Sequence, residues 1–479
     1  MSPLKHSLEE IDLPCSPAEL AAEWGDAPGF ALLDSADGRG WSIATIAPRE
    51  ELRADAHAGA VVPPVHCGSS SPPRPEVPPF ASGWIGFLAY EAAARFDPKF
   101  RVHTLPSSRP ASLWRRYDAS LAFDHDRGRW LLSARDDASG REAARELRER
   151  AHRLTRSLDR DSLRAARQRL GNPAIEESDL SPGAHRVATE AILEWIARGH
   201  IYQANLTYRV ARALAVRPSH LYGLLRAANP APYGALLAID RRLAILSSSP
   251  ELFLRVRGDE VMTRPIKGTR PRRLDDPRLD RALADELRVS AKDQAELTMI
   301  VDLERNDLGR VARYGSVTVE PYPELESFAA VHHLVATVRA RLRPSLSWHE
   351  LLAATFPGGS VTGAPKLRAM EILADLERSP RFVYTGALGW IDDRGDGELN
   401  LAIRTLWLDD GVAHFGVGGG IVADSTPEGE WRETEDKARA LRRALDQAAA
   451  LAQHDRAGVD HSYRSASIGS SFEAFRAGQ

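Results

Sequence analysis

The sequence predicts an α+β fold in which large antiparallel sheets pack against helices, with a smaller N-terminal region. Two apolar runs, 399–408 and 412–422, flank the turn residues Asp-Asp-Gly at 409–411, a pattern typical of a β-hairpin. Long helical patterns at 285–314 and 431–452 alternate with such strands. Hairpins mixed with helices indicate an α+β protein with much antiparallel sheet.

A further strand is predicted at 201–210, where apolar and polar side chains alternate. Gln203, Asn205, Thr207 and Arg209 share one face, because successive side chains of a strand point to opposite sides. The alternation predicts a half-buried strand with one polar face.

Composition places the chain among ordinary globular proteins. Of 479 residues, 43% are hydrophobic and 27% charged, and the net charge is −3. This balance argues against nucleic-acid binding, which normally requires a basic domain. Cys15 and Cys67 have no paired spacing, which indicates neither a disulfide framework nor a zinc site. With no signal peptide or apolar span in the sequence, we expect a cytoplasmic protein.

Breaks in composition predict the organisation of the chain. Residues 61–79 are rich in Pro and Ser and indicate a loop, whereas 141–170 favour a helix. We expect an N-terminal region at 1–172, a catalytic region at 173–452, and a polar tail at 453–479 that frays.

Two constellations could supply a proton donor and a nucleophile. Glu251 follows three serines between apolar runs, so it lies either at a functional strand end or in a surface turn. Lys267 lies between Ile266 and Gly268 in an arginine-rich stretch. If burial and neighbouring cations lower its pKa, its amine becomes a nucleophile, and the arginines attract a carboxylate. The alternative is a solvated basic loop.

Two other groups of residues could bind a ligand: acidic residues on predicted helices, and a run of three glycines. Glu296 lies in one helical run, while Glu430, Glu433 and Lys437 share a face of the last helix. Carboxylates from two helices suit Mg²⁺, although solvated ion pairs would give the same spacing. Gly418, Gly419 and Gly420 either offer N–H groups to an anion or form a bulge.

Taken together and in order, nine segments resemble the chorismate-utilising enzymes over roughly residues 181–445, and GWIGFLAYE at 83–91 extends the likeness. The segments are GHIYQANLTYR, SSSPELFL, RPIKGTRPR, AELTMIVDLERNDLGRV, HLVATVRARL, FPGGSVTGAPKLRAMEI, YTGALGW, AIRTL and GVGGGIVADSTPEGEWRETEDKA. The resemblance implies that family's fold, and a reaction on chorismate.

Three positions favour one branch of this family. Aminodeoxychorismate synthases typically carry Lys where anthranilate synthases carry Ala, and this chain has Lys267. Thr362 likewise stands where anthranilate synthases usually have Ser. Isochorismate and salicylate synthases use a Lys base at the position of Gln203, so attack of water is not expected. Anthranilate synthase component I and a catalytically silent chorismate- or tryptophan-binding paralogue remain the alternatives.

The resemblance also implies roles for individual residues. Glu251 would be the general acid, Lys267 the nucleophile, and His333 a catalytic-site residue beside the ring. Mg²⁺ would be held by Glu296 and Glu433, with Glu430 acting through water. The substrate-binding residues implied in this way are Gln203, Thr269, Thr362, Tyr384, Arg404, Gly418, Gly419, Gly420 and Lys437.

The resemblance implies partners as well. Neither cysteine has the sequence context of a glutaminase nucleophile, so ammonia would come from a separate glutamine amidotransferase subunit, and the product would serve 4-aminobenzoate and folate synthesis. A tryptophan pocket is implied around Ser35, Pro232, Tyr233 and Gly234. Asp34 stands there in place of a Glu, which leaves feedback inhibition open.

Overall fold

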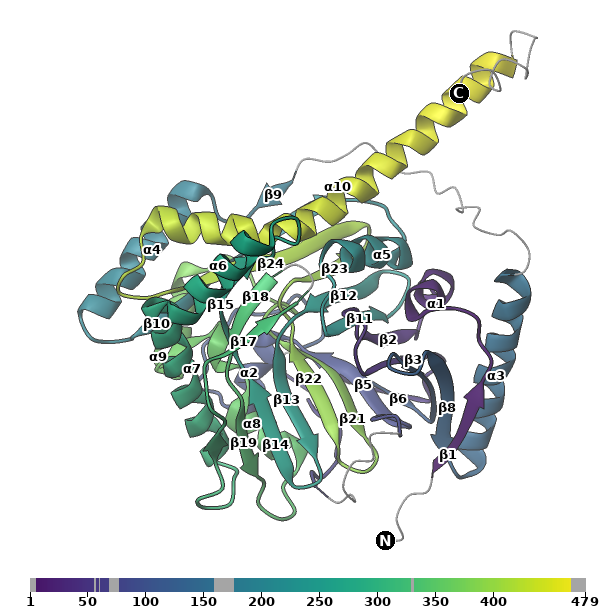
Figure 1. Ribbon diagram of the computed structural model, residues 1–479, viewed down its shortest axis with the longest axis horizontal. Coiled ribbons are helices and arrows are strands. Elements are labelled where there is room, and N and C mark those ends of the chain that lie inside the picture. Colours follow the sequence, from purple (N-terminus) through teal and green to yellow (C-terminus); the bar gives the residue numbers. More distant parts are fainter. Residues whose placement is uncertain are drawn as a thin grey trace.

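The computed structural model describes residues 6–55, 57–59, 61–68, 77–158, 176–328 and 331–466. Two large antiparallel sheets dominate the fold (Figure 1). In spatial order the larger sheet contains β1 (His6–Ile11), β8 (Arg129–Arg135), β7 (Ala119–Asp124), β3 (Trp41–Thr45), β2 (Ala31–Asp34), β11 (Tyr233–Ala238), β12 (Leu243–Ser249), β23 (Thr405–Asp409), β24 (Val412–Ile421), β10 (Gln203–Ala213) and β20 (Gly363–Ala364), with β9 (Glu177–Ser178) beside β10.

The second sheet and a small third sheet complete the β-structure of the described residues. The second contains β16 (Thr318–Val319), β19 (Val338–Arg341), β14 (Glu260–Arg264), β13 (Leu252–Arg257), β22 (Gly397–Leu401), β21 (Ala387–Asp392), β5 (Gly83–Leu88), β6 (Ser112–Tyr117) and β4 (Glu50–Ala54). The third contains β15 (Ile266–Pro271), β18 (Val331–Val335) and β17 (Glu324–Ser327).

Helices pack around these sheets and extend beyond them. They are α1 (Pro17–Trp24), α2 (Ala93–Phe96), α3 (Ala138–Leu158), α4 (Pro182–Ala197), α5 (Pro218–Ala228), α6 (Pro277–Val289), α7 (Ala291–Gly309), α8 (Trp348–Thr355), α9 (Lys366–Leu376) and α10 (Pro427–Ala466), with short 3₁₀ turns η1 (Tyr90–Ala92) and η2 (Gly359–Val361). In Figure 1, α10 crosses the molecule and projects past the sheets. The α+β prediction is therefore confirmed.

Among the described residues, two large apolar cores hold the layers together, and a smaller third one lies between α4, α9 and β10. Between the sheets, Trp407 of β23 and Phe87 of β5 both pack on Phe382, with ring centroids 5.6 and 5.7 Å from it. On the other side of the larger sheet, Phe415 of β24 lies in a second core with Leu441 of α10. Burial of apolar area on both faces of this sheet supplies the main stabilisation of the fold.

The N-terminal and catalytic regions share both sheets. Strand β2 pairs with β11 through Leu32 and Leu236, and β5 pairs with β21 through Gly86 and Gly389. Residues 171–173, where we expect the boundary, lie outside the described residues. Two strands from residues 1–172 are thus hydrogen-bonded directly to strands of 173–452.

The hairpin prediction is confirmed at its turn but wrong at its start. Asp410 and Gly411 have positive φ values of 52° and 81°, as a two-residue hairpin turn requires. The run 399–408, however, divides into β22 in the second sheet and β23 in the larger one. The chain changes sheet at residues 402–404, where Arg404 has φ 49°.

Strand β10 differs from the half-buried prediction because both of its faces are covered. Tyr208 stacks on Trp431 of α10, with ring centroids 5.4 Å apart. On the opposite face, Thr207 donates its N–H and its hydroxyl to Glu377, each over 2.9 Å. The polar row exists, but at Thr207 its partner is a buried protein carboxylate rather than water.

Helix boundaries also differ from the sequence pattern. The run 285–314 is two helices, because Ser290 ends α6 and caps α7 by accepting the N–H of Asp293. Helix α10 continues to Ala466, through part of the region expected to be a fraying tail. The helix predicted at 141–170 is seen as α3 up to Leu158, and residues 159–175 lie outside the described part.

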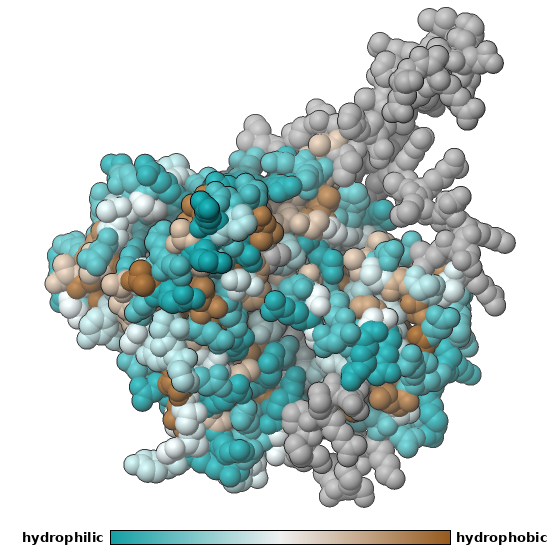
Figure 2. Space-filling model, in the orientation of Figure 1, coloured by the Kyte–Doolittle hydropathy of each residue, from teal (hydrophilic) through white to brown (hydrophobic). Residues whose placement is uncertain are grey.

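The surface is mixed rather than uniformly apolar. Figure 2 shows hydrophobic residues in small separate groups among hydrophilic ones on the face presented. Within the described residues, no helix combines the length and apolarity that a membrane crossing demands. Cys15 and Cys67 are unpaired and buried, in agreement with the absence of a predicted disulfide.

Candidate active site

Glu251 is a buried carboxyl group at the junction of the two sheets. It lies between the end of β12 and the start of β13, and only 6% of the residue is exposed. The Ser360 hydroxyl donates to Glu251 Oε1 over 2.7 Å. Burial raises the pKa of Glu251 to about 7, although Ser360 and Lys267 oppose that rise. A carboxyl group with such a pKa can deliver a proton near neutral pH.

Lys267 enters the same site from strand β15. A bulge between Lys267 and Thr269 is made by Gly268, whose φ is +69°. A Cβ at Gly268 would lie 2.7 Å from Leu287 and 2.9 Å from Asp293, so glycine is required there. The arginine-rich stretch is therefore a strand that directs one lysine inward rather than a solvated loop.

The charged neighbours of Lys267 include carboxylates on several elements. Its charge opposes the rise in pKa that burial causes at Glu251 and at Glu296 of α7, and it adds to the lowering that Lys437 causes at Glu433 of α10. The neighbouring cations that the sequence suggested are not the main feature here. The structure thus brings the predicted acid, the predicted nucleophile and two predicted metal ligands into one electrostatic group.

His333 lies on β18 opposite Thr269. Its Nδ1 is 3.0 Å from Thr269 Oγ1 and 3.2 Å from the carbonyl oxygen of Gly268, and its Nε2 is buried without a protein partner. Burial, aided by Arg404, lowers the pKa of His333 to about 4. The imidazole is therefore neutral at pH 7 and presents one ring nitrogen for a further hydrogen bond.

Two carboxylates of α10, Glu430 and Glu433, lie beside Gly419, and Glu296 of α7 interacts electrostatically with Glu433. A Cβ at Gly419 would lie 3.0 Å from Glu430 Oε2 and 3.9 Å from Glu433 Oε1. Burial raises the pKa of Glu430, whereas Lys437, whose Nζ is 2.7 Å from Glu433 Oε1, lowers the pKa of Glu433. Burial also raises the pKa of Glu296, and the nearby charge of Glu433 adds to that rise.

These carboxylates have the donor chemistry of a hard-cation site. Glu430 Oε2 is buried and has no hydrogen-bond partner. Within the described ranges, no three Asp, Glu, His or Cys side chains converge closely enough to form a complete metal cage. Mg²⁺ commonly keeps several waters and uses one or two protein carboxylates, so the set fits an ion completed by water and substrate.

The glycine run lies inside strand β24 rather than in a turn. Gly418, Gly419 and Gly420 pair with Thr207, Leu206 and Asn205 of β10. A Cβ at Gly420 would lie 2.7 Å from Gln203 Nε2 and 3.6 Å from Lys267 Nζ. The missing side chains leave room for the functional groups that converge on this strand.

Gln203 is the clearest unsatisfied group in the site. It is fully buried, and neither its Oε1 nor its Nε2 has a hydrogen-bond partner. An unpaired buried amide is costly, which favours a ligand as its partner.

The remaining predicted binding residues differ in how far contacts within the protein already engage their side chains. Arg404 donates to Asn229 Oδ1 over 2.8 Å, and Tyr384 packs against Gly416, two residues before the glycine run. The Thr362 hydroxyl is already bonded to the carbonyl of Gly358 at 3.0 Å, so it orders the loop. Lys437 Nζ donates to the Gly418 carbonyl at 3.1 Å.

Sequence reasoning missed Ser360 and Glu304. Ser360 contacts Glu251 directly, and its place inside the GGSVTG segment was the available signal. Glu304 of α7 is buried, and its Oε1 accepts the N–H of Gly359, the residue before Ser360, over 3.1 Å. Nothing in the sequence distinguishes it from the exposed acids of the same helix.

The predicted tryptophan-pocket residues surround a second cavity, of about 480 Å³. Ser35, Pro232, Tyr233 and Gly234 all line it, and so does Asn400, whose buried Oδ1 has no partner. Asp34 is already engaged there: its carboxylate accepts from Ser42, Tyr222 and Arg226.

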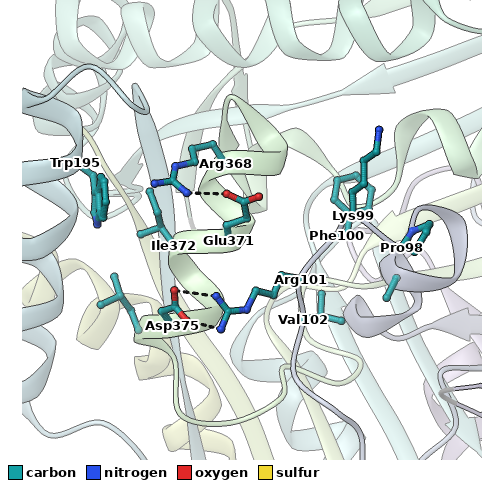
Figure 3. Close-up of a pocket in the computed structure, with 12 residues that line it drawn as sticks. Pro98, Lys99, Phe100, Arg101, Val102, Trp195, Arg368, Glu371, Ile372 and Asp375 are labelled. Carbon is teal, nitrogen blue, oxygen red and sulfur yellow. Dashed lines mark hydrogen bonds and ion pairs between the residues drawn. The ribbon is translucent and has the colours of Figure 1, made fainter.

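A cleft of about 700 Å³ lies elsewhere, between α9, Trp195 of α4 and the segment after α2 (Figure 3). Figure 3 shows Arg101 bridging to Asp375 across it, with nitrogen–oxygen distances of 2.7 and 3.0 Å. None of the described residues lining this cleft is a predicted site residue. This cleft is therefore separate from the predicted site residues around Glu251.

The chain matches a known protein family and named relatives. Residues 29–443 match the family of chorismate binding enzymes. The chain is 40% identical over 400 residues to anthranilate synthase component 1 of Streptomyces coelicolor, covering 81% of this chain and 77% of that protein. It is 37% identical over 376 residues to aminodeoxychorismate synthase component 1 of Bacillus subtilis, covering 78% of each.

Solved structures give the same result. Anthranilate synthase component I from Streptococcus pneumoniae superposes with a TM-score of 0.70 and 30% identity, covering 83% of this chain and 91% of that one. A menaquinone-specific isochorismate synthase from Escherichia coli shares the fold, with a TM-score of 0.67 and 18% identity over 92% and 95% of the two chains. The protein belongs to the chorismate binding enzyme family. Anthranilate and aminodeoxychorismate synthases match it about equally well, so identity alone does not select the reaction.

Proposed function

We propose that this enzyme is an aminodeoxychorismate synthase component I, which converts chorismate and ammonia to 4-amino-4-deoxychorismate. The observation that carries the proposal is Lys267, which β15 directs into the site beside Glu251. An amine at this position can form a temporary bond to the substrate, whereas an alanine cannot.

The first displacement removes the C4 hydroxyl of chorismate. Lys267 Nζ attacks C2, the two conjugated ring double bonds shift from C1=C2 and C5=C6 to C1=C6 and C4=C5, and the C4–O bond breaks. Glu251 donates its proton to the departing oxygen, which leaves as water. Burial of Glu251 supports this role, because it keeps a proton on the carboxyl group near neutral pH.

The second displacement returns nitrogen to C4. Ammonia attacks C4, the two double bonds return to C5=C6 and C1=C2, and the C2–N bond to Lys267 breaks, so that the lysine leaves as the amine. The new C4 ammonium passes one proton to the Glu251 carboxylate, which restores the acid for the next turnover. The enolpyruvyl group is retained, so a separate lyase reaction must release pyruvate afterwards.

Other residues of the chain bind and orient the substrate in this proposal. The unpaired amide of Gln203 and the Nε2 of His333 are available to substrate oxygens. Glu296, Glu430 and Glu433 would hold Mg²⁺, which supplies positive charge for a substrate carboxylate. Lys437 and Arg404 contribute further positive charge.

We infer a separate source of ammonia. The relatives named component 1 support a partner subunit, and the two cysteines are both buried in the core. Burial raises the pKa of the Cys15 thiol to about 12, which is unsuited to a glutaminase nucleophile. A glutamine amidotransferase subunit would deliver ammonia to this chain.

The deciding experiment combines purified protein, chorismate, Mg²⁺ and an ammonium salt at alkaline pH. Products are identified by mass spectrometry and pyruvate is measured by a coupled assay. Aminodeoxychorismate without pyruvate is expected. Anthranilate with pyruvate would instead assign the chain to anthranilate synthase, and no product even with a glutaminase subunit would favour the silent paralogue.

The cavity around Asn400 supports an amino-acid effector site, for which we propose tryptophan as the ligand. The unpaired Oδ1 of Asn400 can accept from an ammonium or indole N–H group, and the cavity of about 480 Å³ can hold an indole side chain. Calorimetric titration with tryptophan tests this; no heat of binding for wild type would reject the assignment.

A further inference from the structure

The loop that carries Ser360 is fastened to helix α7 at two points. Glu304 Oε1 accepts the N–H of Gly359 over 3.1 Å. One turn later, Asp307 Oδ2 pairs with Lys366 Nζ at 2.6 Å, and that amine also donates to the Thr355 carbonyl at 3.0 Å. Helix α7 therefore holds both ends of the segment that crosses the active site.

The first of these anchors is tightly fitted. A Cβ at Gly359 would lie 2.6 Å from Leu303 and 3.1 Å from Glu304 Oε1, so the loop approaches the helix as closely as a backbone can. Only 2% of Glu304 is exposed, and its Oε2 has no partner. Such a carboxyl group is costly to bury, and its hydrogen bond to a described residue is the one to Gly359 of this loop.

The next residue along the loop touches the acid. Ser360 follows Gly359 in the 3₁₀ turn η2, and its hydroxyl is 2.7 Å from Glu251 Oε1. A chain of contacts thus runs from Glu304 through Gly359 and Ser360 to Glu251. Rotation or displacement of Gly359 would move Ser360 away from the acid.

Resting on the function proposed above, we propose that Glu304 is a positioning residue of the reaction, which fixes the hydroxyl of Ser360 against the acid that protonates the leaving oxygen. It touches no substrate itself. It acts as a hydrogen-bond acceptor for Gly359, and its second oxygen plays no part in this role.

Charges near the two carboxyl groups set the expected pH behaviour. Ser360 on η2, Lys267 and the Ile266 N–H on β15, and Lys437 on α10 all lower the pKa of Glu251 against the effect of burial. Burial, with Asp307 and Glu251, raises the pKa of Glu304 to about 8, and Lys366 opposes the rise. The direction of this shift favours the neutral form of Glu304, which still has an oxygen that accepts the Gly359 N–H.

The test is the pH dependence of kcat for wild type, E304A, E304Q and S360A. Because Ser360 stabilises the ionised form of Glu251, its removal raises the pKa of the acid and moves the alkaline limb of kcat upward by about one pH unit. We expect E304A to shift the limb as S360A does, with an unchanged KM for chorismate. The double variant E304A/S360A should shift the limb no further than either single variant, because both substitutions remove the same interaction between Ser360 and Glu251.

A conservative replacement separates this role from general stability. E304Q keeps an oxygen acceptor for the Gly359 N–H, so its limb should return to the wild-type position. E304D withdraws the acceptor by one methylene and should behave like E304A, which covers the case that E304A fails to fold. The proposal would be overturned if E304D and E304A kept the wild-type alkaline limb of kcat, or if E304Q shifted that limb as far as they do. Additive shifts in E304A/S360A would overturn it too.

Product analysis keeps the two proposals distinct. If wild type makes anthranilate, the proposed function fails, yet the limb shifts still test Glu304, because the C4 hydroxyl needs an acid in either reaction. A readout without turnover is the infrared carbonyl band of protonated Glu251, identified by its absence in E251Q. The pH at which this band disappears should rise in E304A and S360A and not in E304Q.

Discussion

Replacing Glu251 by Gln should inactivate the enzyme and stabilise it at alkaline pH. Glu251 is 6% exposed, and burial raises its pKa from 4.5 to about 7. A folded-state pKa above the unfolded value means that the protonated group favours folding at low pH. That advantage is lost as pH rises from 4.5 through about 7, because the native state must then bury a charge.

The pKa shift of Glu251 gives the size of the expected change in unfolding free energy. A difference of 2.5 pKa units, taken from 4.5 to about 7, corresponds to about 3 kcal/mol of unfolding free energy. Gln does not titrate, so E251Q lacks this loss. Its unfolding free energy relative to wild type should therefore increase by about 3 kcal/mol between pH 4.5 and pH 8.

Urea unfolding of both proteins at acid and alkaline pH measures this difference, and kcat is measured alongside. Other buried acids titrate in both proteins and cancel in the comparison. E428Q is a matched control, because the Glu428 side chain is 56% exposed and stays in water. The kcat of E251Q should fall by about 10²–10⁴, as for loss of a general acid. A stability difference independent of pH would refute the burial of the acid, and wild-type kcat would refute its role.

Three further substitutions test other parts of the structure. K267A should abolish formation of aminodeoxychorismate and of any covalent adduct seen by mass spectrometry, whereas K292A should keep both. E433A should raise the Mg²⁺ concentration needed for half-maximal activity, because a carboxylate beside the proposed ion is lost. R381M should lower the unfolding free energy by about 3–5 kcal/mol, because it strands the Glu377 carboxylate inside the protein.

Each of these outcomes has a control and a contrary result. Turnover of K267A at the wild-type rate would remove the covalent route. E428A, on the first turn of the same helix as Glu433, should leave the Mg²⁺ titration unchanged, and an equal titration in E433A would dismiss that ligand. R439M breaks an exposed pair and should cost less than about 1 kcal/mol, so an equal loss in R381M would contradict the buried ion pair.

The chemistry of the site could be predicted further from sequence than its architecture. Glu251, Lys267 and Glu433 were identified because their motifs occur in a specific order, and the structure places them in one electrostatic group. Local patterns also gave the Asp410-Gly411 turn, because positive φ restricts the residue types there.

Long-range pairing explains what the sequence did not show. The polar face of β10 has the same pattern as a solvated strand, since its partner Glu377 is far away in sequence. The switch of the chain between sheets falls at Arg404, a residue type that does not signal positive φ. Ser290 was a usable signal, because serine before a helical run is a common N-cap, yet the continuous apolar pattern concealed it.

The sharing of both sheets by distant strands has a consequence during synthesis. Strand β5 ends at Leu88, and its partner β21 begins at Ala387. The ribosome therefore makes about 300 more residues before this pair can form, which takes about 15–60 s at 5–20 residues per second. Until then β5 has an unpaired edge facing its future partner, and such edges can bind other chains. A chaperone that covers the β5 edge during this interval would therefore keep it from binding other chains.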